Sequence, residues 1–151
     1  MDKEENIRIQ MRHFKMENVR AGVFATASRL YGLNIESVEG APVYHPDVEV
    51  FKVSDAADGS LLGILTTDYY PRSTKRGGAW MNNVREQYVD ADGTEVRPII
   101  VNVGNFTKPA ADNPSLLTID EVGTMFHEFG HALHGLLTKC HYKGVSGTSV
   151  A

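Results

Sequence analysis

Two histidines four residues apart, with a glutamate directly after the first, occur in the stretch FHEFGHALHG near the end of the 151-residue chain. Side chains four apart on a helix lie one turn above each other, with Cβ atoms about 5–6 Å apart, so His127 and His131 can converge on one ion. Glu128 is displaced from His131 by about 60° around the helix axis, which suits a base acting on a water rather than a ligand. The spacing predicts a zinc site with His127 and His131 as ligands and Glu128 as the catalytic residue.

A third protein ligand for such an ion is not evident in the sequence. The metzincin pattern needs a histidine ten residues after the first, where this chain has Leu137. His134 lies an axial rise of about 10.5 Å from the first histidine, too far to share the ion. No Asp or Glu occurs between positions 132 and 151, and Cys140 and His141 follow near the helix end as weak candidates. The third ligand is expected either upstream in an unusual arrangement or beyond the last residue.

The motif is predicted to lie on an amphipathic helix that begins at Thr118. Glu121 stands three residues later, the spacing of a capping box. At 100° per residue, with His127 at 0°, the motif residues fall on one side and the apolar residues between about 180° and 280°. This apolar stripe consists of Ile119, Val122, Phe126, Phe129, Leu133, Leu136 and Leu137. The interior Gly130 costs about 1 kcal/mol relative to alanine, which favours a close approach of another backbone or a ligand there.

The remaining elements predict an α+β fold, with helices at both ends and a small, mainly antiparallel sheet between them. An earlier helix is indicated by Val19, Val23, Ala27 and Leu30, with Gly32 as its stop. The middle of the chain has the composition of three to five strands. A hairpin is predicted from Val48–Val53 and Leu61–Tyr70 around the turn Asp55–Ser60, with further strands in Ala79–Val89 and Arg97–Val103.

Composition excludes several classes of partner. The formal net charge of −4 and pI near 5.8 argue against nucleic-acid binding, which usually needs a basic face. The single cysteine cannot form an internal disulfide, so a reduced cytoplasm is the expected location. No run approaches the ~18 apolar residues of a membrane span, so no membrane partner is expected. The oligomeric state is left open.

The tract Leu116–Ala151 resembles the active-site region of the thimet oligopeptidase family of zinc metallopeptidases, most of all its bacterial peptidyl-dipeptidase (dipeptidyl carboxypeptidase) branch. Three upstream segments, Pro42–Val53, Asp68–Asn83 and Val101–Pro109, also resemble that branch in order and spacing. The resemblance covers most of the chain from about Asn18 onward.

This resemblance implies a function. His127 and His131 would bind Zn²⁺, and Glu128 would be the general base that takes a proton from a zinc-bound water. The third ligand would be a glutamate beyond residue 151, so residues 1–151 would be a single piece of the catalytic domain of a larger, mostly helical peptidase. The substrates would be short peptides, with release of C-terminal dipeptides expected. The alternatives are an endo-oligopeptidase with the same chemistry, or a fragment that is inactive because it lacks the third ligand.

The family pattern also marks three charged residues, Asp68, Arg72 and Lys75. An ion pair between the sheet and a loop is the favoured interpretation, and direct substrate contact is the alternative. Either the strand near Val101 or the segment Gly77–Trp80 is expected to offer its backbone groups to an extended peptide, as an edge strand does.

Overall fold

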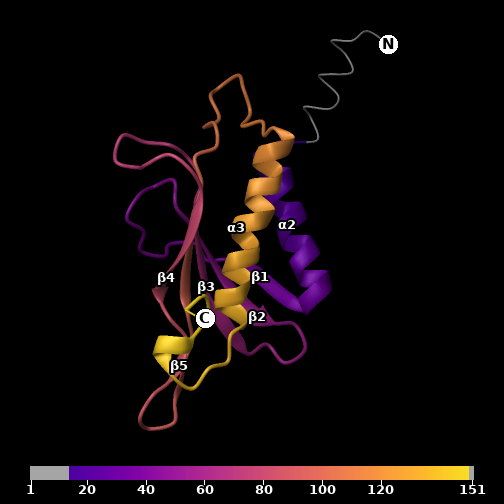
Figure 1. Cartoon of the computed structure of the whole chain (residues 1–151). Coiled ribbons are helices and arrows are strands. Elements are labelled where there is room, and N and C mark those ends of the chain that lie inside the picture. The colour runs from indigo at the N-terminus through magenta and orange to yellow at the C-terminus, as the bar shows by residue number, and fades with distance from the viewer. Residues whose placement is uncertain (1–13, 150–151) are drawn as a thin grey trace.

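Two helices lie against one face of a five-stranded sheet in the computed structural model, which describes residues 14–149 (Figure 1). The strand order is β1-β2-β3-β7-β4, and β5 and β6 form a separate two-stranded ribbon. This confirms the predicted α+β class. In chain order the elements are α2 (Met16–Tyr31), β1 (Leu33–Ser37), β2 (Glu49–Asp55), β3 (Leu61–Asp68), β4 (Trp80–Arg85), β5 (Tyr88–Val89), β6 (Glu95–Val96), β7 (Ile99–Val103), α3 (Ile119–Leu137) and the short 3₁₀ helix η1 (Lys143–Val145).

The sheet is mixed. Three of its neighbouring strand pairs are antiparallel, as predicted, whereas β3 and β7 run parallel. The predicted hairpin is confirmed as β2 and β3, whose turn is closed by a hydrogen bond from the Asp55 N–H to the Ser60 carbonyl at 2.9 Å. The parallel pair and β1 were not predicted, because neither has a local signal: β1 is short and polar, and β3 meets β7 only after a long excursion of the chain. Within residues 14–149, no helix is both long and apolar enough to cross a lipid bilayer.

Helix α2 ends at the residue predicted to stop it. Gly32 has φ 64°, in the left-handed region, and its N–H donates to the Ser28 carbonyl at 2.9 Å. The predicted apolar positions are buried except for Leu30, which is 70% exposed. Around the axis of α2, Leu30 lies on the same side as the buried residues. It stands in the last turn, however, where neither α3 nor the sheet covers it. Helix α2 packs on α3 through Phe24 and Phe129, whose ring centroids are 5.4 Å apart.

Helix α3 begins with the predicted capping box. The Thr118 Oγ1 accepts a hydrogen bond from the Glu121 N–H, and the Glu121 carboxylate accepts one from the Thr118 N–H. Its buried face differs from the predicted stripe, since Ile119 and Phe126 are 67% and 44% exposed. With His127 at 0° and 100° per residue, as above, the buried residues fall between about 80° and 200° around the helix axis. They are Met125, Phe129, Ala132, Gly135 and Leu136.

The rotation of α3 follows from small residues that permit close approach to the sheet. A Cβ atom added at Gly135 would lie 2.6 Å from Ile100 Cδ1 and 3.0 Å from Asn83 Oδ1. The helix therefore touches β7 and β4 through its backbone at this position, which a stripe drawn from large apolar residues does not reveal. The predicted close approach of another backbone at Gly130 is wrong for the described part of the chain, where nothing lies within 4 Å of a Cβ added there, and the alternative of a ligand at Gly130 stays a prediction.

Replacing Gly135 with alanine should destabilise the fold by about 1–3 kcal/mol, because the new methyl overpacks a fully buried contact with Ile100. The matched control is Gly123→Ala in the same helix, where a Cβ meets nothing among the described residues within 4 Å. That substitution should stabilise the chain by up to about 1 kcal/mol through helix propensity alone. Urea unfolding followed by circular dichroism compares the two. Equal effects would contradict the close contact.

Candidate active site

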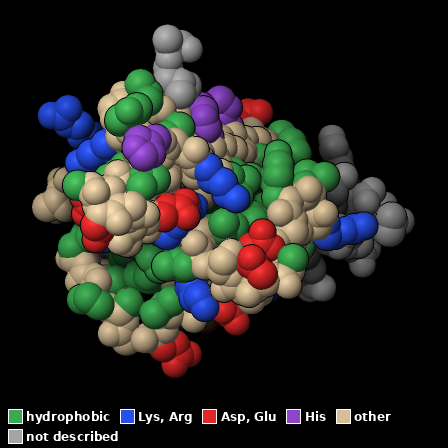
Figure 2. Space-filling view, turned by 90° about the horizontal axis from the view of Figure 1, so that it is seen from below, with side chains coloured by type: hydrophobic (Ala, Val, Ile, Leu, Met, Phe, Trp, Pro, Cys, Tyr) green, Lys and Arg blue, Asp and Glu red, His purple; other side chains and the backbone are tan. Residues whose placement is uncertain are grey.

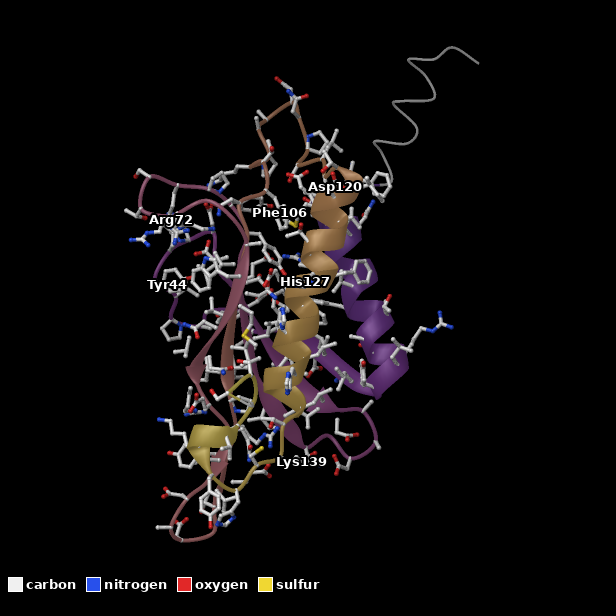
Figure 3. All side chains as sticks on the ribbon, viewed as in Figure 1. Tyr44, Arg72, Phe106, Asp120, His127 and Lys139 are labelled. Atoms are coloured by element: carbon white, nitrogen blue, oxygen red, sulfur yellow. The ribbon has the colours of Figure 1, made fainter. Side chains whose placement is uncertain are left out.

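The two motif histidines face each other on the solvent side of α3. Their Nε2 atoms are 3.1 Å apart, and their rings are nearly perpendicular, at 84°, with centroids separated by 4.7 Å. Both side chains are exposed, and His127 is labelled on α3 in Figure 3. The predicted convergence of His127 and His131 on one point is therefore present in the geometry.

This separation is compatible with a shared zinc ion. Two nitrogen ligands at about 2.0–2.1 Å from a tetrahedral ion lie about 3.4 Å apart, so a small rotation of either ring would accommodate the ion. The same distance also permits one protonated Nε2 to donate a hydrogen bond to the other ring. Both rings present a nitrogen lone pair to solvent-accessible space when neutral, which is the state that binds metal. The donor set thus fits zinc, while metal binding by these residues stays a prediction.

Glu128 lies beside this pair at the margin of the buried face. Its side chain is half-buried, whereas the histidines before and after it on the helix are exposed. The sequence predicts that Glu128 lies on the side of the helix opposite the apolar stripe. The rotation of α3 toward Gly135 instead brings it near the edge of the helix–sheet interface. A carboxylate held there can act on a group bound at the histidines without itself completing their ligand set.

The candidate third ligands do not gather at the histidines. Among residues 14–149, no group of three or more His, Cys, Asp or Glu side chains is placed to hold a metal. His134 is exposed one turn beyond His131. Cys140 and His141 follow the end of α3: the Cys140 Sγ contacts the Thr138 hydroxyl at 3.4 Å, and the His141 ring packs edge-on against Tyr142.

The charged residues marked by the family pattern form a buried cluster at the end of β3. The Asp68 carboxylate accepts two hydrogen bonds from Arg72, both at 2.8 Å, and one from the Tyr44 hydroxyl at 2.9 Å. The Lys75 ammonium lies 3.1 Å from the same carboxylate and also donates to the carbonyls of Tyr70 and Gly104. This network fastens the loop after β3 to the end of β7, as the ion-pair interpretation predicts.

Burial of the Asp68 carboxyl by itself would raise its pKa. Hydrogen bonds from Arg72, Tyr44 and Lys75 to the charged form outweigh that effect and lower the pKa to about 2. Burial, reinforced by the hydrogen bond to Asp68, raises the pKa of the Tyr44 hydroxyl to about 12. Asp68 is therefore fixed as a carboxylate at neutral pH and Tyr44 as a neutral phenol, so neither is a proton carrier.

The Asp68 cluster lies on the face of the sheet opposite α3. Ile100 contacts Gly135 of α3, so Leu65, its partner across the β3–β7 pairing, faces α3 as well. Side chains alternate along a strand, so Asp68 and Val103, a pair three residues further on, point to the other face. Figure 3 likewise places the Tyr44 and Arg72 labels across the sheet from His127. The arrangement therefore favours the ion pair over direct substrate contact at the histidines.

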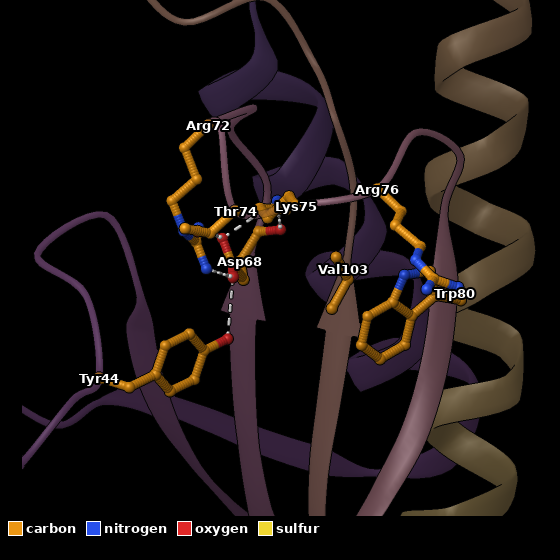
Figure 4. A pocket seen from close by; sticks show the side chains of 8 residues that line it. All are labelled: Tyr44, Asp68, Arg72, Thr74, Lys75, Arg76, Trp80 and Val103. Atoms are coloured by element: carbon orange, nitrogen blue, oxygen red, sulfur yellow. Dashed lines mark hydrogen bonds and ion pairs between the residues drawn. The ribbon is translucent and has the colours of Figure 1, made fainter.

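A hollow of about 580 Å³ adjoins this cluster on that face (Figure 4). Its polar lining is largely engaged in the Asp68 network, and exposed Trp80 supplies an aromatic wall. The lining residues are Tyr44, Asp68, Arg72, Thr74, Lys75, Arg76, Trp80 and Val103.

The two predicted peptide-binding edges have different outcomes. Val101 lies in β7, which is paired on both sides, by β3 and by β4, so this strand has no free edge and the prediction is wrong there. β4 is the last strand of the sheet and packs against α3, and it begins at Trp80, the end of the second predicted segment.

On the surface of the molecule seen from below, acidic and basic side chains are interspersed and histidines reach the surface (Figure 2).

Comparison with known proteins gives consistent matches. The sequence model of the family described as Peptidase family M3 matches residues 2–151. The chain is 44% identical over 138 residues to dipeptidyl carboxypeptidase of Escherichia coli (strain K12), covering 91% of the chain and 20% of that protein. It is 41% identical over 141 residues to oligopeptidase A of the same organism, covering 93% and 21%. It is 39% identical over 131 residues to a probable cytosolic oligopeptidase A of Arabidopsis thaliana, covering 84% and 19%. The chain spans about a fifth of the length of these curated relatives.

The depressed pKa of Asp68 makes stability depend on pH. The unfolded carboxyl titrates near pH 3.9 and the folded one at about 2, so the folded state binds fewer protons between these values and loses stability as pH falls through that window. The loss should be about 2 kcal/mol. In Asp68→Asn this part of the pH dependence should vanish, while stability at pH 7 drops by about 3 kcal/mol.

The control is the exposed ion pair of Lys108 with Asp47, where Lys108→Gln should cost under about 1 kcal/mol at pH 7. Urea titrations at several acidic pH values measure all three proteins. If the free energy of unfolding of Asp68→Asn still falls below pH 4 as steeply as that of the unsubstituted protein, the assignment of this pH dependence to Asp68 is refuted.

Proposed function

Given that this chain belongs to peptidase family M3, a family of metallopeptidases, we propose that its full-length protein hydrolyses peptide bonds at a zinc ion held by His127 and His131. Glu128 is the general base. The observation that carries this proposal is the pair of facing imidazole nitrogens, 3.1 Å apart on a rigid helix, with a half-buried carboxylate beside them. The roles of these three residues are supported by geometry and by the motif.

Each side chain has a defined task in this proposal. Zinc, when bound, acidifies a water and polarises the scissile carbonyl. Glu128 accepts the proton of the attacking water and passes it to the departing amine. His127 and His131 would hold the ion through the lone pairs of their neutral ring nitrogens.

A third ligand is needed to complete the site. We place it beyond residue 151, as the resemblance to the thimet oligopeptidase family implies, because the described residues bring no third His, Cys, Asp or Glu to the pair. The 151 residues alone are therefore proposed to bind zinc weakly and to be inactive. The full-length protein would provide the remaining ligand and the other wall of the substrate channel.

Short peptides are the proposed substrates. Among residues 14–149, β4 is paired with another strand on one side only, so an extended peptide can add to its other edge. Strand β4 also packs against α3, the helix that carries the motif. Release of C-terminal dipeptides is the proposed specificity, and internal cleavage is the alternative. Identities of 44% to a dipeptidyl carboxypeptidase and 41% to an oligopeptidase do not separate the two. We also propose a cytoplasmic location, with neither nucleic acid nor membrane as partner.

Replacing Glu128 with glutamine in the full-length protein should lower kcat by about 10²–10⁴-fold, because the amide cannot accept the proton of the water. Zinc content, measured by atomic absorption, should stay unchanged. The control is Asp120→Asn, an exposed carboxylate two turns earlier on α3, which should retain activity. Turnover retained by Glu128→Gln would disprove its assignment as the base.

The position of cleavage distinguishes the two specificities. Peptides of graded length should yield dipeptides from their C-termini, and amidation of the terminal carboxylate should slow hydrolysis if that group is recognised. Mass spectrometry of the products identifies each cut. Products that arise mainly from internal bonds, with amidated and free peptides cleaved equally, would assign the protein as an endo-oligopeptidase.

A further inference from the structure

The hollow beside Asp68 is built on a row of three side chains that crosses the sheet. Asp68 of β3 pairs with Val103 of β7, and Val103 pairs with Trp80 of β4, so the three side chains stand on one face, opposite α3. Two strand spacings, or about 10 Å, separate Trp80 from Asp68, and a valine lies between them. Tyr44 stands on the other side of Asp68 and bonds to it (Figure 4). The hollow therefore has an aromatic ring on each side, and both residues are exposed, Tyr44 at 65% and Trp80 at 44%.

The loop that forms the remaining wall of the hollow, residues 70–79, is held in place by hydrogen bonds. The Lys75 ammonium donates to three backbone carbonyls, which ties the loop to the ends of β3 and β7. The side-chain amide of Asn105 donates to the carbonyls of Arg76 at 2.9 Å and Gly78 at 2.7 Å. A ligand that enters the hollow therefore meets a loop whose backbone is already ordered, so little conformational entropy is lost when it binds.

Positive charge is concentrated at this hollow, and part of its hydrogen-bonding capacity is unused. The lining holds three cations, Arg72, Lys75 and Arg76, against the single carboxylate of Asp68, which leaves a net charge of +2 in a chain whose net charge is −4. Arg72 uses two of its five N–H donors on Asp68. Arg76 is exposed, and among residues 14–149 it is bonded only through its backbone carbonyl. Guanidinium N–H groups of both arginines are therefore available to an anion.

We propose that this hollow binds a small organic anion in which a carboxylate or phosphate group is joined to a flat ring. The guanidinium groups of Arg72 and Arg76 match the paired oxygens of such a group. The exposed rings of Trp80 and Tyr44 offer surfaces on which the ring of the ligand can stack. A volume of about 580 Å³ is in the range of small-ligand sites. An inorganic anion would leave the aromatic walls uncovered, and a neutral ring would leave the guanidinium donors without an acceptor.

This site is independent of the proposed zinc chemistry. It lies across the sheet from His127 and His131, so its ligand is not the peptide bond that is cleaved (Figure 3). A bound anion would contact both the loop after β3 and Trp80, the first residue of β4. It would therefore stabilise the start of β4 from the face of the sheet that α3 does not cover.

The test titrates the full-length protein with N-acetylphenylalanine and with phenyl phosphate, and measures affinity by isothermal titration calorimetry. At least one of the two should bind saturably, and the tighter one identifies the carboxylate or the phosphate as the preferred group. Arg76→Gln should weaken binding by about 10–100-fold, the effect of losing a hydrogen bond between charged groups. The neutral amide of the first probe, and acetate and inorganic phosphate, which have no ring, should bind at least about tenfold more weakly.

Fluorescence locates the bound probe. Trp80 is the single tryptophan of the 151 residues, and it lines the hollow. Its emission should change saturably with the tighter probe, and this change should be absent from Trp80→Phe, which keeps an aromatic ring at the position. A change of the same size in Trp80→Phe would show that the probe binds elsewhere, and the inference would be overturned.

Two further variants are the controls. Arg29→Gln removes an exposed cation from the last turn of α2, and His131→Ala removes a proposed zinc ligand, and both should bind the probes as the unsubstituted protein does. The urea midpoint of Arg76→Gln should be unchanged, which separates lost binding from lost folding. The inference is overturned if neither probe binds or if Arg76→Gln binds as tightly as the unsubstituted protein. It is also overturned if binding disappears in His131→Ala, because the probes would then occupy the metal site.

Discussion

The contact between α3 and the sheet at Gly135 sets the rotation of the helix, and the placement of the candidate site follows from it. Because Gly135 has no side chain, the helix backbone reaches Ile100, and a rotation by one residue would move every side chain by about 100°. In the observed rotation His127 and His131 point to solvent and Glu128 lies at the margin of the interface. The same glycine accepts the close approach of Gly147, so one position fixes both the helix and the segment that follows it.

Buried polar side chains fasten the loops on either side of this helix–sheet unit. On the face opposite α3, Asp68 gathers the charged groups of Arg72 and Lys75, and Lys75 also binds backbone carbonyls. At the other end of the sheet, the neutral amide of Gln87 forms hydrogen bonds with the N–H and the carbonyl of Cys140, in the segment that follows α3. The first network places two cations on one carboxylate, so its stability depends on charge and pH. The second uses a neutral amide, so its hydrogen bonds do not depend on a charged group.

Family membership and local geometry support the proposed chemistry in different ways. The match to peptidase family M3 covers residues 2–151 and points to hydrolysis of peptides, but it does not assign roles to individual atoms. The facing nitrogens of His127 and His131, and the neighbouring Glu128, provide a physical arrangement in which those roles are possible. The edge of β4 that no other described strand pairs with adds a surface of the kind that binds an extended chain.

The sequence alone determined the local elements: the capped helix at Thr118, the end of α2 at Gly32, and the hairpin of β2 and β3. Each depends on residues a few positions apart, whose spacing is visible in one dimension. Tertiary structure alone decided that Phe126 is exposed and that Gly135 is buried, because the packing of α3 is set by where a backbone can approach, not by hydrophobicity. The parallel pairing of β3 with β7 and the hydrogen bonds of Gln87 to Cys140 likewise join segments that are distant in sequence. Such contacts leave no periodic signal along the chain.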